Sequence, residues 1–304
     1  MKSHFRTIFA IVLYLLLPAV IVAQTHRASL RGTVYDGTGA AIPLASIKLT
    51  SLATGETKET DSGNEGSYAF TSLQPGLYEL TIQKPQFEVQ VLKIELLVNQ
   101  ELRKDITLEI GEVTAGVIDA TDEANLQKDT PSLSTVIENR QITGLPLDGR
   151  NFYELSLLVP GAVPAAPGSA GSVRGDFSFS VNGAREDGNN FLLDGVYNVD
   201  PKLNTFGVRP SVEAIREFEM LTSTYDASFG RNPGAQVNVI LNSGSNDFHG
   251  NLFEFHRNAA FDARNFFAPA SEPKPKYIRN QFGGSLGGPI SRNRTFFLDR
   301  KSVV

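Results

Sequence analysis

The sequence has no cysteine among its 304 residues. This absence excludes a disulfide framework, a zinc site built on thiolates and the lipid-bearing cysteine that anchors a bacterial lipoprotein. A basic surface is lacking as well, because acidic residues outnumber basic ones and the net charge is -5. Proteins that bind nucleic acid usually carry a clustered basic footprint, so no nucleic-acid partner is expected.

The sequence also lacks a convincing catalytic, metal or cofactor site. Ser271 and Lys274 have the spacing of penicillin-recognising enzymes, but the two prolines beside Lys274 oppose the helix that this motif requires. His249 and His256 are seven residues apart, and on a strand they point to opposite faces, so a shared metal is not expected. The run GGSLGGPI lacks the glycine order of a dinucleotide-binding motif. We therefore expect neither an enzyme nor a bound cofactor.

Long apolar runs are absent except at the N-terminus. Lys2 and Arg6 precede an apolar run from Ile8 to Val22, and Ile21 and Ala23 offer a cleavage site. The run is shorter than the roughly 20 residues of a transmembrane helix, so residues 1–23 are interpreted as a secretory signal peptide. The mature protein is then exported, and it could cross a membrane only as a β-barrel.

The composition changes near residue 144. Of the 27 glycines 17 follow this point, and so do 16 of the 20 phenylalanines. The length suggests about two domains, and the shift places a boundary between two different kinds. Enrichment in glycine and aromatic residues suits an outer-membrane β protein, whose aromatic side chains gather at the lipid interfaces.

The first domain, residues 27–109, has the pattern of a β-sandwich. Leu30 and Val34 alternate with polar residues, and the same period of two returns from Ala45 to Leu49 and from Tyr78 to Ile82. Turn residues separate these runs at short intervals, which is typical of a sandwich. The turn from Asp61 to Gly66 is interpreted as a hairpin.

The apolar phase slips between Phe87 and Leu96, which predicts a bulge or a strand end. The run GTVYDGTGAAIPLASIKLT, followed by TDSGNEGSYAFTSLQPGLYELTIQKPQF, resembles the carboxypeptidase regulatory-like domain, a transthyretin-like sandwich. Pro85-Gln86 stands where that family more often has glycine, so a different turn is expected there. The resemblance implies no peptidase activity, because the segment has no histidine after His26.

The second part mixes short helices and strands. Short helices are predicted for Val136–Ile142 and Asn151–Leu158, and a helix that runs into a strand for Val212–Glu219, with Ser211 as N-cap. SFSV and NFLLD are predicted strands, joined by turns at Asn-Gly and Asp-Gly pairs. Polar and apolar residues between Gln236 and Asn242 predict a strand half buried inside a barrel lumen.

Three further strands are predicted beyond residue 246. Phe248–Arg257 has the length of a tilted transmembrane strand. A second strand follows from Ile278 and is expected to end at Pro289, and a third begins at Thr295. The alternation within these segments is weak, as is normal for barrel strands.

Several motifs together resemble Oar-like TonB-dependent outer-membrane receptors of Gram-negative bacteria. They are LPLDGRN, SFSVNGAREDGNNFLLDGV, the run from FHGNLFEFHRN to NFFAP, and RNQFGGSLGGPI. The resemblance implies a plug domain over residues 110–245 and the start of a barrel over 246–304. The fold is then mainly β: a transthyretin-like sandwich, an α+β plug and the first strands of a truncated transmembrane barrel.

The resemblance also implies partners. These are a TonB energy transducer, outer-membrane lipid and an extracellular ligand, which would be an oligosaccharide, a peptide or a chelate. The TonB box, a segment that pairs with TonB by strand addition, is assigned to Glu112, Val113, Thr114 and Ala115. A plain interdomain linker is the alternative.

Six charged residues of the predicted plug are candidates for contacts with a ligand or with the barrel wall. They are Arg185, Glu186, Asp187, Arg216, Glu217 and Arg231. Two functions are weighed: a TonB-dependent receptor with sandwich and plug on the periplasmic side, and a surface adhesion or matrix protein whose sandwich binds a partner such as a carbohydrate. Two or three strands cannot close a barrel, and residues 299–304 depart from the family pattern, so a truncated gene product with a non-native end is expected.

Overall fold

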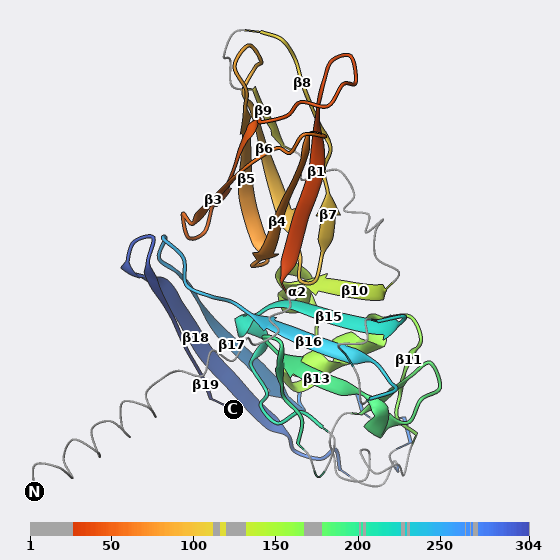
Figure 1. Cartoon of the computed structure of the whole chain (residues 1–304). Helices are drawn as coiled ribbons and strands as arrows, with labels where there is room; N and C mark the ends of the chain where they lie inside the picture. The colour runs from red at the N-terminus through yellow and green to blue at the C-terminus, as the bar shows by residue number, and fades with distance from the viewer. Residues whose placement is uncertain are drawn as a thin grey trace, which may run out of the picture.

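The computed structural model describes residues 27–111, 116–119, 132–166, 178–200, 202, 205–225, 229, 232–264, 266–267, 269 and 273–303. The predicted signal peptide, the TonB-box candidate at 112–115 and Arg231 lie outside these residues. The described chain forms a sandwich, a mixed sheet beneath it and an antiparallel ribbon alongside (Figure 1). The expected mainly β fold is confirmed.

The sandwich is built from two sheets. One has the order β4-β1-β7, with β8 also paired to β1, and the other has the order β3-β2-β5-β6-β9. The strands are β1 (Ala28–Asp36), β2 (Ser46–Ser51), β3 (Thr57–Asp61), β4 (Ser67–Leu73), β5 (Gly76–Gln83), β6 (Gln90–Leu96), β7 (Glu101–Arg103), β8 (Ile106–Leu108) and β9 (Gly116–Asp119). The predicted alternation is confirmed, since Leu30, Val34 and Leu80 are fully buried in one core. The second sheet extends beyond residue 109, because β9 pairs in parallel with β6.

Two local predictions in the sandwich have clear outcomes. The Asp61–Gly66 turn is not a hairpin, because β3 pairs with β2 in one sheet while β4 pairs with β1 in the other. The turn therefore carries the chain between the sheets. The phase slip marks a strand start: Phe87 forms an isolated bridge with Ile110, and β6 begins at Gln90. Gln86 has a φ of 77°, a left-handed backbone conformation that glycine adopts more readily than other residues.

Gly32 marks the point where β1 changes partners. Residues before it pair with β7, and residues after it pair with β8. The Lys104 backbone between these strands lies over Gly32, and its carbonyl accepts a hydrogen bond from the Tyr68 hydroxyl at 2.7 Å. A Cβ at residue 32 would lie 1.8 Å from the Lys104 oxygen, so no larger residue fits.

The second unit, which we call the plug sheet, has the order β10-β15-β16-β13-β14. Its strands are β10 (Leu133–Glu138), β13 (Asn190–Leu193), β14 (Val196–Tyr197), β15 (Ile215–Ser223) and β16 (Gln236–Leu241). One face carries Phe218, Met220 and Val239, which are buried in the second core together with Phe152 and Tyr153. The opposite face carries polar side chains, among them Glu217, Glu219, Gln236 and Asn238.

Tertiary pairing overrides several predictions for the plug sheet. The segment from Val136 to Glu138 is strand rather than helix, because β10 pairs with β15, and the helix α2 covers only Asn139–Gly144. The predicted helix near Asn151 exists as the 3-10 helix η3 (Phe152–Leu158). The predicted short helix that runs into a strand over Val212–Glu219 is confirmed, as the 3-10 turn η5 (Val212–Ala214) followed by β15. β16 is central and nearly all buried rather than half buried.

The two predicted strands SFSV and NFLLD both form, but they do not pair with each other. The first is β12 (Phe179–Val181), which pairs with β11 (Ala162–Pro164), and η4 (Glu186–Gly188) separates it from β13. β13 pairs with β14 through the two-residue turn Asp194–Gly195, in which both residues have positive φ as predicted.

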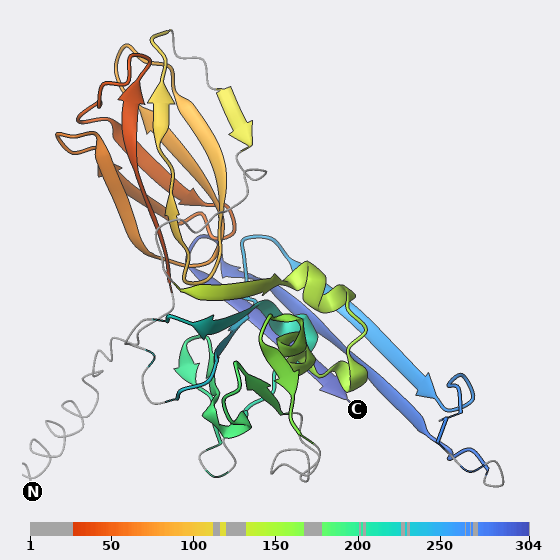
Figure 2. The same ribbon diagram turned by 90° about the vertical axis from the view of Figure 1, so that its right-hand side faces the viewer.

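The ribbon consists of β17 (His249–Asn258), β18 (Ile278–Ser291) and β19 (Thr295–Val303), in that order, and we call these the wall strands. Pro289 does not end the second strand, because β18 continues past it to Ser291. Residues 299–303 continue β19 in register with β18. In the part of the chain that the structure describes, no helix has the length and apolar character needed to cross a membrane. Figure 2 shows the ribbon running past the plug sheet and beyond it.

Replacing Gly32 by alanine should destabilise the sandwich by about 1–3 kcal/mol, the usual cost of overpacking. The added methyl group would force β1 away from the Lys104 backbone. Gly37→Ala is the matched control, since a Cβ there meets nothing within 4 Å, and it should change stability by less than about 0.5 kcal/mol. Native-state hydrogen exchange of the β1 amides measures both values, and equal effects would contradict the packing described.

Candidate functional site

The LPLDGRN segment connects α2 to η3 and presents an arginine to the rest of the molecule. Leu145 and Leu147 pack against the plug core. Gly149 and Arg150 follow with φ values of 61° and 58°, a left-handed pair that turns the chain sharply. Asn151 then caps η3, because its Oδ1 accepts a hydrogen bond from the Tyr153 amide at 3.3 Å.

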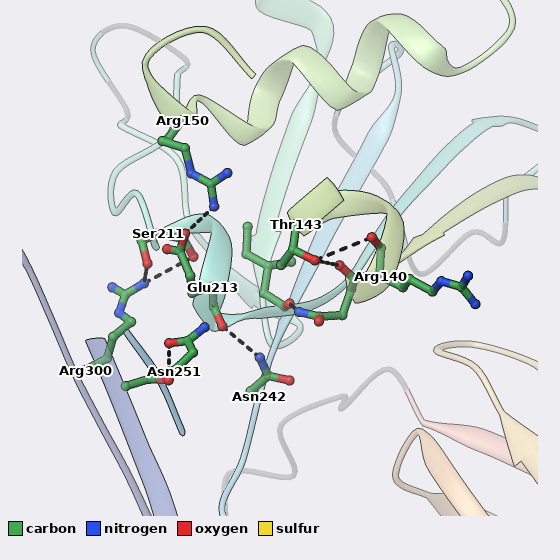
Figure 3. A network of polar contacts seen from close by, with 11 residues as sticks. Arg140, Thr143, Arg150, Ser211, Glu213, Asn242, Asn251 and Arg300 are labelled. Carbon is green, nitrogen blue, oxygen red and sulfur yellow. Dashed lines mark hydrogen bonds and ion pairs between the residues drawn. The ribbon is translucent and has the colours of Figure 1, made fainter. Parts of the chain in front are cut away.

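Arg150 forms a buried ion pair with Glu213 (Figure 3). The Arg150 and Glu213 side chains are 9% and 4% exposed. Glu213 lies in η5, and its carbonyl accepts a hydrogen bond from Asn242 Nδ2 at 3.0 Å. A buried pair of this kind offsets its desolvation only when its geometry is fixed by further contacts. Here Asn242, in the segment after β16, holds the Glu213 backbone, while Arg150 Nε is buried without a hydrogen-bond partner among the described residues.

Each wall strand contributes one side chain to the same region. From β17, the Phe255 ring lies 4.2 Å from the Arg150 guanidinium carbon, a cation–π contact. From β18, Arg279 donates to the Gly149 carbonyl at 3.4 Å. From β19, Arg300 donates to the Ser211 carbonyl at 3.1 Å. We call this set of contacts the plug–wall seam.

Ser211 occupies the predicted N-cap position but does not cap. Its backbone is extended as a cap requires, yet its side chain makes no hydrogen bond to η5. The hydroxyl instead contacts Arg300 of β19 (Figure 3). Ser211, which the sequence assigns to the start of a helix, therefore binds the wall strand β19 instead.

The six predicted contact residues do not form one site. Arg185 and Asp187 form an exposed ion pair at 2.9 Å, and Glu186 accepts a hydrogen bond from the Ser178 hydroxyl at 2.6 Å. Arg216 and Glu217 face the sandwich, as described below, and Arg231 lies outside the described residues. Their role in ligand binding stays a prediction.

A second polar junction lies between the sandwich and the plug sheet, and we call it the sandwich–plug seam. The Val98 amide of the sandwich donates to Glu217 at 2.8 Å, and Asn99 Nδ2 donates to Glu219 at 2.5 Å. Arg216 lies against Gly76 of β5, so that a Cβ there would be 2.7 Å from the guanidinium.

Burial raises the pKa of both carboxyl groups in this seam. Desolvation is the main cause for Glu219, whose pKa is raised to about 8, with the Asn99 amide opposing the shift and the Glu217 charge adding to it. Desolvation also raises the pKa of Glu217, against the Val98 hydrogen bond and the Arg216 charge. Glu219 therefore holds a proton at neutral pH.

Sequence patterns did not find either seam. The signal available for Arg150 was its place in the LPLDGRN motif, next to a glycine at a sharp turn. Glu217 and Glu219 alternate with Phe218 and Met220, which indicates a strand with one polar face, but the covering of that face comes from residues over 100 positions away. Among the residues that the structure describes, no three acidic or histidine side chains gather as they would around a metal ion.

Replacing Glu213 by glutamine should lower the free energy of unfolding by about 3 kcal/mol, because Arg150 stays buried without its counter-charge. Glu254→Gln, an exposed carboxylate on β17, is the matched control and should cost less than about 0.5 kcal/mol. Pulse proteolysis in urea on the detergent-solubilised protein measures both. A loss for Glu213→Gln no larger than for the control would show that the pair is not buried.

Comparisons with known proteins place these features in a family. Residues 29–109 match the carboxypeptidase regulatory-like domain, and residues 240–299 match the outer membrane beta barrel domain. The chain is 26% identical to the TonB-dependent transporter Oar of Myxococcus xanthus, over 91% of this chain and 26% of that protein. The chain thus spans about a quarter of the length of this curated relative.

Solved structures with a partial likeness include two outer-membrane proteins. The siderophore receptor PirA of Acinetobacter baumannii has a TM-score of 0.44 and 20% identity, over 58% of this chain and 25% of that one. The outer membrane transporter YddB of Escherichia coli has a TM-score of 0.39 and 17% identity, over 51% and 24% of the two chains.

The regulatory-like match covers the sandwich strands β1 to β8, and the barrel match extends from the end of β16 into β19. The matched barrel domain makes this an outer-membrane protein. Over most of its length the chain resembles the Oar-like TonB-dependent outer-membrane receptors.

Proposed function

We propose that this chain is the N-terminal part of a receptor that takes up a ligand across the outer membrane when TonB displaces its plug. The observation that carries the proposal is the plug–wall seam. Arg150 and Glu213 lie between the plug core and three wall strands, each of which touches the turn at Gly149–Arg150 or the start of η5. Each wall strand is attached to the plug by a contact of its own, and gated uptake needs a plug that is held in this way.

The seam is polar, and this suits a plug that must move. When a polar seam opens, its charged and polar groups form hydrogen bonds with water in place of the contacts that they lose. When a large apolar interface opens, its surface is exposed to water and the free energy gained by burial is lost. The plug core, in contrast, is apolar and separate from the seam. The plug can then shift against the wall while the central strands β15, β16 and β13 of its sheet stay paired.

TonB pulling on Glu112–Ala115 would act first on β9, which pairs with β6 of the sandwich, and then on β10. β10 is an edge strand with β15 as its neighbour in the plug sheet. An edge strand peels from a sheet more easily than a central one, since it breaks one ladder of hydrogen bonds. The proposal keeps Glu112–Ala115 as the TonB box and residues 27–109, 110–245 and 246–304 as the three parts.

The ligand belongs to one of three classes: an oligosaccharide, a peptide or a chelate. Arg185, Glu186 and Asp187 remain candidate contacts, since Arg185 and Asp187 are exposed at the start of η4. The alternative of a surface adhesion or matrix protein is disfavoured by the match of residues 240–299 to an outer membrane beta barrel domain.

The TonB contact is tested by site-specific cross-linking, for which the native lack of cysteine is an advantage. Single cysteines at 112, 113, 114 and 115 should each be tried against a cysteine in the periplasmic domain of TonB. We expect a disulfide adduct at alternate positions, because strand addition exposes every second side chain. Thr107→Cys, on the exposed side of β8, is the control and should give none. No adduct at any of the four positions would overturn the assignment.

A further inference from the structure

One loop of the sandwich lies against the polar face of the plug sheet at Glu217 and Glu219. This loop, Leu97–Gln100, joins β6 to β7 and holds its own shape: Gln100 Oε1 accepts a hydrogen bond from the Leu97 amide at 2.9 Å. Gln100 and Val98 are almost fully buried. The loop therefore enters the seam as a preformed unit.

The two hydrogen bonds from this loop go to neighbouring carboxylates. Val98 donates from its backbone and Asn99 from its side chain, to Glu217 and Glu219 respectively. Both carboxylates point from β15 toward the sandwich, whereas Phe218 between them points into the plug core. If the sandwich moved away, both carboxylates would face water.

Charges of both signs lie around this pair of carboxylates. Arg216 lies 3.5 Å from Glu217, and Arg27 lines the same cavity as Arg216. Burial is the main cause that raises the pKa of Glu217, and the charges of Glu95 on β6 and Glu138 on β10 add to it. Burial and the charge of Glu217 favour protonation of Glu219.

We propose that the loop Leu97–Gln100 is a proton-linked latch that holds the sandwich on the plug sheet. The docked state carries a proton on Glu219 that the separated state releases. The ordinary pKa of this carboxyl is 4.5, and in the docked state it is about 8. Docking is therefore strongest below pH 4.5. It weakens as the pH rises from 4.5 to about 8, and the docking equilibrium constant falls by at most about tenfold per pH unit in this range.

Protons can reach the latch through solvent. An open cavity of about 250 Å³ lies beside the seam and is lined by residues of both units, among them Gln74 and Pro75 from the sandwich and Arg216 and Asn242 from the plug side. The seam is thus hydrated at one edge while Glu219 itself is 1% exposed. The proposal does not depend on transport activity.

The test measures docking directly in the complete receptor, held in lipid nanodiscs. Cysteines at Thr107 and Gln141, both exposed and on opposite sides of the seam, carry spin labels, after any cysteine beyond these 304 residues has been replaced by serine. Double electron–electron resonance should give one narrow distance at pH 5.5. At pH 9 a broad population of longer distances should appear, with a separated-to-docked ratio at least tenfold higher.

Variants separate the latch from general effects of pH. Glu219→Gln, which cannot lose a proton, should keep the narrow distance at both pH values. Glu59→Gln, an exposed carboxylate of β3, is the control and should behave as the native chain. Asn99→Gly removes the amide but keeps the left-handed backbone at φ 54°, and should increase the separated population at every pH. It tests the same contact from the sandwich side if Glu219→Gln does not fold.

Two results would overturn the proposal. One is an unchanged single distance from pH 5.5 to 9 in the native chain. The other is a pH response in Glu219→Gln equal to that of the native chain, which would assign the proton to another group.

Discussion

The buried pair of Arg150 and Glu213 is the contact on which the lower half of the molecule depends. A guanidinium and a carboxylate removed from water must be held at close range, or their desolvation is not offset. This requirement explains the left-handed turn at Gly149–Arg150, the cap at Asn151 and the single 3-10 turn that carries Glu213. The wall strands then attach to the backbone that the pair has fixed.

The plug sheet separates two kinds of contact. Its apolar face forms a core that belongs to the plug alone, and this core makes the sheet a stable body. Its polar face and its loops make the contacts with the sandwich and the wall, and these contacts are hydrogen bonds and ion pairs. Stability and the capacity to move are therefore assigned to different surfaces of one sheet.

Much of the fold could be predicted from the sequence because its signals are local. The alternation around Leu30 and Val34 indicates a half-buried strand, and the Asp194–Gly195 pair indicates a two-residue turn. The LPLDGRN motif and the aromatic run after residue 247 pointed to the family. Each of these signals is confined to about ten residues.

The remainder depends on contacts between distant residues. Val136–Glu138 has the residues of a helix start but is captured as a strand by β15, some 80 positions later. Gln236 and Asn238 alternate with valines, as residues do on a strand with one face exposed to solvent. Both are nevertheless buried. The sequence around Ser211 suggests a helix cap, and that around Glu217 suggests an exposed position on a strand. Their actual partners, Arg300 and Val98, lie in other units. No local pattern encodes such partners.

The central claim is that Arg150 and Glu213 act as one unit inside the plug–wall seam. The most direct test is a double-mutant cycle of Arg150→Met and Glu213→Leu, with the free energy of unfolding measured for the native receptor, both single variants and the double variant. Each single change should leave a buried charge, whereas the double change removes both, so a coupling energy of about 3 kcal/mol is expected. Additive effects, within about 0.5 kcal/mol, would contradict the account.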